Sequence, residues 1–242
     1  MKKFFSLPII KQSIKSVWIW ILISVVAQSV NFFAQSSQAE DGTQLLVNFF
    51  VDSSLMFNGM IFLTIIAVLL GTILITNEVD RGSLAIALST PTTRTQILLS
   101  KCLVMAGSLL LMNLLIGTIG SLAPIMFRIE FDQGMWWTII ALWLCYTFLV
   151  AGISFFAACW FNKSRFSIAT TALVLGIFYL LGMIAMMEDF AFFRFFTLQT
   201  LFNTDAVIEG NRFLWQFIVI LVIAIPLYIF GVLKFSKKDL PL

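Results

Sequence analysis

The chain has 242 residues, of which 60% are hydrophobic and only 11% are charged, and its formal net charge is +3. A soluble domain carries about 25% charged residues, so this composition excludes an ordinary soluble protein and predicts a membrane protein. The small positive charge does not indicate nucleic-acid binding, because the basic residues fall in gaps between apolar stretches, where a membrane orients them.

Six apolar stretches run through the sequence, and none contains a charged residue. Each is long enough to cross about 30 Å of hydrocarbon as an α-helix. A charge at the bilayer centre costs ~2.5–3.5 kcal/mol, so six uncharged stretches favour an all-α polytopic fold. We expect one membrane domain over residues 1–242, with spans at about 17–34, 55–75, 102–127, 135–158, 167–187 and 213–233.

Charges alternate between the gaps. Twelve of the 15 basic residues lie in the N-terminal segment, the second gap, the fourth gap and the C-terminal tail, whereas nine of the 12 acidic residues lie in the other gaps. The positive-inside rule therefore places both termini in the cytoplasm. A cleaved signal peptide is the alternative for the first stretch, but the stretch is longer than a signal core of about 7–15 residues.

The segment before the first span, residues 1–16, has helical spacing. Ile10 and Ile14 repeat on one face, while Lys11 and Lys15 lie four residues apart on another. This pattern predicts an amphipathic interfacial helix on the inner leaflet, with its lysines toward anionic headgroups. A simple extension of the first span is the alternative.

The segment between the fifth and sixth spans is too apolar for a free loop, yet its charged residues prevent a further span. We expect one or two short helices half buried in the outer leaflet, or aromatic anchors with no further role. The residues that mark this external half-buried segment are Phe190, Phe193, Phe196 and Leu201.

Residues that support catalysis are missing from the sequence. The chain has no histidine, which excludes Ser–His chemistry and histidine metal sites, and it has no G-x-x-x-x-G-K-[ST] loop for ATP. The three cysteines, Cys102, Cys145 and Cys159, are interpreted as packing residues. We therefore expect no enzyme activity, no metal site and no cofactor bound by this chain.

The first cytoplasmic loop, residues 77–94, carries the most informative pattern. Gly82 permits a bend, Ser83 can cap a helix, and Pro91 stops it. The short helix between them would expose Leu84 and Leu88 one turn apart, and such a pair favours a groove on a partner protein. A connector folded back on its own helices is the alternative.

The same loop resembles the membrane subunit of type-2 ATP-binding-cassette (ABC-2) exporters. The resemblance is the pattern E-x-x-x-G-[ST]-L, then L-[ST]-x-P-x-x-R and a lysine, together with six spans and the Lys-Lys-Asp-Leu sequence near the C-terminus. The matching residues are Glu78, Gly82, Ser83, Leu84, Leu88, Ser89, Pro91, Arg94 and Lys101.

The resemblance implies a permease that works as a pair, homomeric or heteromeric, with two separate ATPase subunits that bind ATP and Mg. It implies that residues 83–88 form a coupling helix in an ATPase groove, oriented by charge pairs of Glu78 and Arg94. Asp80 is close enough in sequence to leave open which carboxylate pairs with Arg94. A second cytoplasmic contact would involve Asn162, Lys163 and Arg165, whose basic residues alternatively only set topology.

From these features we expect a multi-pass permease of an ATP-driven exporter in a bacterial plasma membrane. Because the spans lack charges, an apolar or amphipathic cargo such as a drug, a lipid or a membrane-active peptide is favoured over an ion. One alternative is a membrane scaffold or sensor that recruits a soluble partner through the first cytoplasmic loop. Another is an enzyme that acts on lipids.

Overall fold

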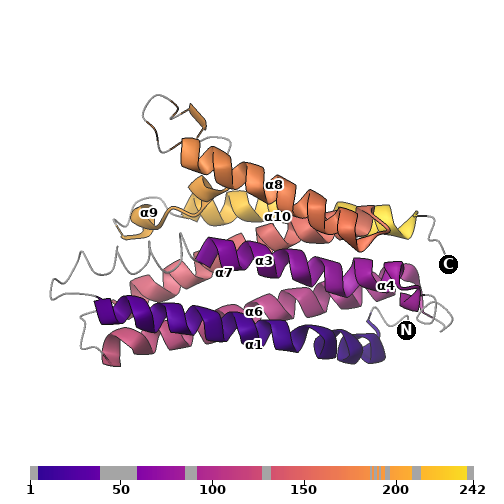
Figure 1. Ribbon diagram of the computed structural model, residues 1–242, viewed down its shortest axis with the longest axis horizontal. Helices are drawn as coiled ribbons and strands as arrows, with labels where there is room; N and C mark the ends of the chain where they lie inside the picture. The colour runs from indigo at the N-terminus through magenta and orange to yellow at the C-terminus, as the bar shows by residue number, and fades with distance from the viewer. Residues whose placement is uncertain are drawn as a thin grey trace.

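The computed structural model describes residues 5–38, 59–84, 92–126, 132–185, 187, 190, 192–193, 197–208 and 214–238. Within these ranges the chain is helical and contains no strand (Figure 1), which confirms the all-α fold. The elements are α1 (Leu7–Gln38), α3 (Met60–Gly71), the π-helical turn η2 (Thr72–Thr76), α4 (Asn77–Asp80), α6 (Arg94–Met126), α7 (Gln133–Trp160), α8 (Ser164–Ile184), the 3-10 turn η4 (Gln199–Leu201), α9 (Thr204–Ile208) and α10 (Leu214–Ser236).

Six helices in the described part of the chain are long and apolar enough to cross a membrane, as the sequence predicts. Several of them extend beyond the uncharged stretches. The third, for example, begins at Arg94 rather than near residue 102. The reason is physical: charge is excluded only from the hydrocarbon, whereas the helix can continue through the headgroup layer.

The N-terminal segment is helical, as expected, but it is continuous with the first span. Helix α1 runs without a break for 32 residues, or about 48 Å, which exceeds the hydrocarbon thickness of about 30 Å. No glycine or proline follows Pro8 within α1, so nothing in the sequence breaks the helix where it enters the membrane. The structure therefore has an extension of the first span and no separate interfacial helix within the described residues.

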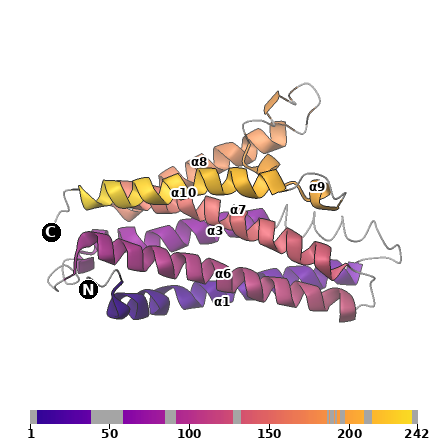
Figure 2. The ribbon, with the colours of Figure 1, turned by 180° about the vertical axis from the view of Figure 1, so that it is seen from behind.

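The helices pack as a bundle in which α1 lies along α6 and α10 lies along α7 (Figures 1 and 2). Helix α7 contacts most of the other long helices and supplies much of the core. Tyr228 of α10 stacks on Phe148 of α7 with ring centroids 4.4 Å apart, and its hydroxyl donates to the Phe148 carbonyl at 3.0 Å. The far end of α8 diverges from this bundle (Figure 2).

Small residues let the helices approach closely at two crossings. Gly71 of α3 packs directly against Ser154 of α7. Gly117 and Gly120 of α6 lie under two tryptophans at the start of α7, and the Trp136 indole donates to the Gly117 carbonyl at 2.9 Å. As a result Trp136 is only 1% exposed, although a tryptophan beside an external turn commonly lies at the lipid interface.

The segment between α8 and α10 contains the short helices that its composition predicts, η4 and α9. Phe190 is exposed, whereas Phe193 and Leu201 are half-buried. Phe202 is fully buried against Trp143 at 4.9 Å and Tyr146 at 5.8 Å between ring centroids. Phe196 lies outside the described residues.

Candidate functional site

Distant parts of the sequence meet at one end of the bundle, where α1 begins, α10 ends and α4 is found (Figure 1). The described ends of the first cytoplasmic loop and the α7–α8 turn are also at this end, which is the end that the charge pattern assigns to the cytoplasm. The backbone N–H of Ser6 donates to Ser100 at 3.0 Å, so the chain before α1 is attached to α6 here.

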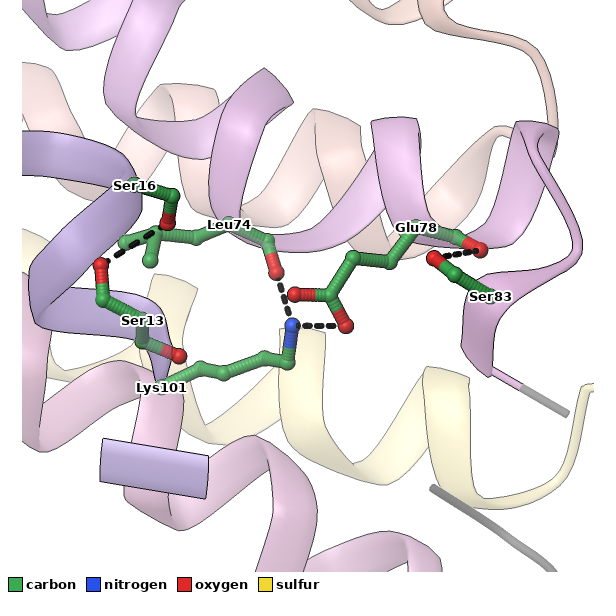
Figure 3. A network of polar contacts seen from close by, with 6 residues as sticks. All are labelled: Ser13, Ser16, Leu74, Glu78, Ser83 and Lys101. Carbon is green, nitrogen blue, oxygen red and sulfur yellow. Dashed lines mark hydrogen bonds and ion pairs between the residues drawn. The ribbon is translucent and has the colours of Figure 1, made fainter. Parts of the chain in front are cut away.

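A buried ion pair joins α4 to α6. The Lys101 ammonium lies 2.6 Å from a Glu78 carboxylate oxygen, and the two side chains are 2% and 19% exposed. The same ammonium donates to the Leu74 carbonyl (Figure 3). An unpaired charge in such surroundings would be very costly, so each group requires the other.

The ion pair lies next to an irregular turn in the second membrane helix. Between α3 and α4 the backbone widens into the π-helical turn η2, and Leu74, which accepts from Lys101, lies within that turn. π-helical turns interrupt an α-helix and are frequently found at functional sites. Gly71, which packs against α7, immediately precedes this turn.

A second contact joins α4 to the start of α8. The backbone N–H of Ser164 donates to the Asp80 carboxylate at 3.1 Å, and the Ser164 hydroxyl donates to the Asn77 side-chain oxygen at 2.7 Å. The N-cap residue of α8, Lys163, makes no side-chain cap of its own. Asp80 therefore satisfies a free N–H at this helix start and places a negative charge at the positive end of the helix dipole.

A third contact joins the start of α6 to the C-terminal segment. The Arg94 guanidinium donates to the Lys238 backbone carbonyl at 2.8 Å. Within the described residues, therefore, Arg94 forms an ion pair with neither Glu78 nor Asp80. The expected charge pair between Arg94 and one of these carboxylates is wrong. Glu78 pairs with Lys101 because a lysine buried two turns further along α6 has the greater need of a counter-charge.

The residues that follow α4 turn back toward the bundle. Gly82 has a φ of +70°, a conformation that suits glycine, and its N–H donates to the Val79 carbonyl at 3.1 Å. The Ser83 hydroxyl donates to the Glu78 carbonyl at 3.3 Å, and helix resumes at Ser83 and Leu84. Leu84 is only 3% exposed, so the prediction that it is exposed is wrong: the turn at Gly82 directs it into the core.

The other predicted residues are placed as follows. Leu88 and Pro91 lie outside the described residues. Asn162 is half-buried, and its side-chain oxygen has no hydrogen-bond partner among the described groups. Lys163 and Arg165 are exposed, and the Arg165 guanidinium lies 5.2 Å from the centre of the Phe166 ring.

Sequence reasoning missed Asn77 and Ser164, and it did not identify the partner of Asp80. Asn77 and Ser164 are 87 residues apart, and Arg94 and Lys238 are 144 residues apart, so no local spacing connects them. Within the part of the chain that the structure describes, no three His, Cys, Asp or Glu residues come together to hold a metal ion.

Lys238 is expected to make stability depend on pH. Burial, with a smaller effect of nearby Lys234, lowers its pKa to about 8 from an ordinary value of 10.5, and its ammonium donates to the Cys159 carbonyl at 3.1 Å. Between these two pH values the unfolded chain binds more protons, so folding stability should rise with pH. We therefore expect the unfolding midpoint of the wild type to rise relative to that of Lys238→Met as the pH increases from about 8 to 10. A difference between the two midpoints that does not change with pH would contradict this prediction.

The comparison with protein families identifies the chain. The model of the ABC-2 family transporter protein matches residues 11–181, which include nearly all of the first five membrane helices, the first cytoplasmic loop and the α7–α8 turn. A comparison with curated proteins found no match. The matched domain is a permease rather than an ATP-binding domain, and its family implies partnership with ABC ATPase subunits. With six apolar helices and this match over well over half of its length, the chain is a multi-pass membrane protein with a transport role and belongs to the ABC-2 transporter family.

Proposed function

We propose that this chain is the permease subunit of an ATP-driven exporter in a bacterial plasma membrane. It pairs with a second permease, identical or homologous, and with two separate ATPase subunits that bind ATP and Mg. Its cargo is apolar or amphipathic: a drug, a lipid or a membrane-active peptide. The observation that carries the proposal is the buried Glu78–Lys101 pair at the base of the first cytoplasmic loop.

Contacts at the two ends of the loop join it to α6, to α8 and to the residues that follow α10. Glu78 contacts α6 through Lys101, Asp80 contacts α8 through Ser164, and Arg94 contacts the residues after α10. A buried ion pair is expensive to separate, so the helices it joins resist sliding past one another. A force applied to the loop by an ATPase would therefore move these helices together, as a transport cycle requires.

The apolar character of the spans supports the cargo class. A groove of about 540 Å³ lies between α7, α8 and α10, within the range of ligand pockets. Its walls are almost entirely apolar. They include Phe156 on α7, Val174 on α8 and Leu227 on α10. Such a groove excludes a free ion, because it offers no charged partner to replace the water shell of the ion.

Purification of the chain from its native host tests the ATPase partnership. We expect an ABC ATPase to copurify with the wild type and its recovery to fall at least roughly tenfold with Leu88→Asp, since this change puts a charge into an apolar contact. Leu84 is avoided because it is buried in the bundle. Asn203→Asp is the matched control, since it adds the same charge at an exposed residue of the opposite end.

Two outcomes would contradict the proposal. Recovery of the chain with a partner that is not an ATPase would instead support a membrane scaffold or sensor. Turnover of a lipid by the purified chain without ATP, lost when a single Asp or Glu is replaced, would support an enzyme.

A further inference from the structure

A second apolar groove, of about 620 Å³, lies between α1 and α6. Its lining residues recur at helical spacing, from Ile10 to Val26 on α1 and from Leu103 to Leu115 on α6. Gly107 forms part of the α6 wall, and a Cβ atom built there would meet nothing within 4 Å. The groove is thus open at its middle rather than closed by packing. Helices α1 and α6 lie on the side of the bundle away from α8 and α10 (Figure 1), so this groove is separate from the α7–α8–α10 groove.

The groove has the length of one membrane leaflet. Along α6 the groove extends from Leu103 to Leu115, a rise of about 18 Å over twelve residue steps. This is close to half of a hydrocarbon core of about 30 Å plus the adjoining interface. The groove begins at Ile10 and Ile14, which precede the first uncharged stretch, and ends at Val26 inside that stretch and at Leu115 inside the third. It therefore runs from the headgroup layer toward the bilayer centre, as an acyl chain does.

Two exposed lysines lie at the headgroup end. Ile10 and Ile14 line one edge of the groove, and the lysines lie toward its other edge. Lys15 precedes Trp18 by three residues and Leu22 by seven, so it lies beside these two groove residues, with Lys11 one turn before it. Helical side chains tilt toward the N-terminus, so both ammonium groups are directed away from the hydrocarbon. Neither α1 nor residues 94–122 contain an acidic residue. The mouth of the groove therefore carries positive charge that these two helices do not neutralise.

These charges favour a lipid over a second copy of the chain. A two-fold interface along a membrane-normal axis brings the same surface of both copies together at the same depth. Lys11 and Lys15 would then face their own counterparts, and like charges repel. An anionic headgroup instead supplies the missing counter-charge.

We propose that the α1–α6 groove is a binding site for an anionic phospholipid, with one acyl chain along the groove and the phosphate held by Lys11 and Lys15. The site goes beyond the exporter function proposed above and does not depend on it, since no ATPase contact is involved.

Native mass spectrometry of the full chain in detergent, titrated with phosphatidylglycerol or with phosphatidylcholine, tests this site. Two lysines contribute about 1 kcal/mol each, so Lys11→Gln with Lys15→Gln should weaken phosphatidylglycerol binding roughly 30-fold and change phosphatidylcholine binding little. Gly107→Leu should fill the groove and weaken both lipids at least about tenfold.

Matched controls exist for both changes. Gly176→Leu introduces the same side chain on α8 where a Cβ also meets nothing within 4 Å, and Gly176 does not line the groove. Lys163→Gln with Lys237→Gln removes two exposed lysines elsewhere at the same end. Both controls should bind phosphatidylglycerol like the wild type.

Unchanged phosphatidylglycerol binding by Gly107→Leu would overturn the proposal. So would equal losses in the lysine variant and its lysine control, because the headgroup preference would then reflect overall charge. A shift of the chain from dimer to monomer in Gly107→Leu, with lipid binding intact, would show that the groove is a protein interface instead.

Discussion

Lys101→Met is expected to lower the free energy of unfolding by about 3–5 kcal/mol, the typical cost of removing one partner of a buried ion pair. The substitution keeps most of the apolar volume of the side chain but leaves Glu78 without a counter-charge. It also removes the donor to the Leu74 carbonyl in the π-helical turn. Denaturant unfolding of the purified chain in detergent, followed by tryptophan fluorescence, measures the change.

The double variant Glu78→Gln with Lys101→Met separates charge from packing. Because it leaves no unpaired ion in the bundle, we expect it to recover most of the stability that Lys101→Met loses. Lys237→Met removes an exposed lysine and should leave stability within about 0.5 kcal/mol of the wild type. A double variant no more stable than Lys101→Met would show that the unpaired Glu78 charge is not the cause of the lost stability.

Gly71→Ala is expected to destabilise the chain by about 1–3 kcal/mol, although alanine has the higher helix propensity. A Cβ atom on Gly71 would overlap the Ser154 hydroxyl and lie 2.9 Å from both the backbone carbon and the oxygen of Ser154. Backbone atoms cannot move aside cheaply, so α3 and α7 would have to separate. The unfolding midpoint in detergent measures the effect.

Gly176→Ala is the matched control for this prediction. Its Cβ meets nothing within 4 Å, so the change should raise stability by about 0.5–1 kcal/mol through helix propensity alone. Adding Ser154→Gly to Gly71→Ala should restore only part of the loss, because the backbone contact remains. If Gly71→Ala and Gly176→Ala raised stability equally, the close α3–α7 crossing would be incorrect.

The sequence by itself determined the class and outline of this protein. A charge in hydrocarbon costs so much that six uncharged stretches identify six spans without any tertiary information, and α7, α8 and α10 lie close to the predicted positions. The turn at Gly82 was predictable for a similar reason: few residues other than glycine adopt a positive φ, so the requirement is local.

Only the tertiary structure decided which residues meet at the cytoplasmic end. The motif contains Glu78, Arg94 and Lys101, but the pairing of Glu78 with Lys101 depends on how α4 and α6 pack. Likewise, Leu84 belongs to a pattern typical of an exposed helix, and only the fold back after Gly82 buries it. Spacing along a chain records local geometry and the cost of solvation, whereas the partner of a side chain is set by helix packing between residues far apart in sequence.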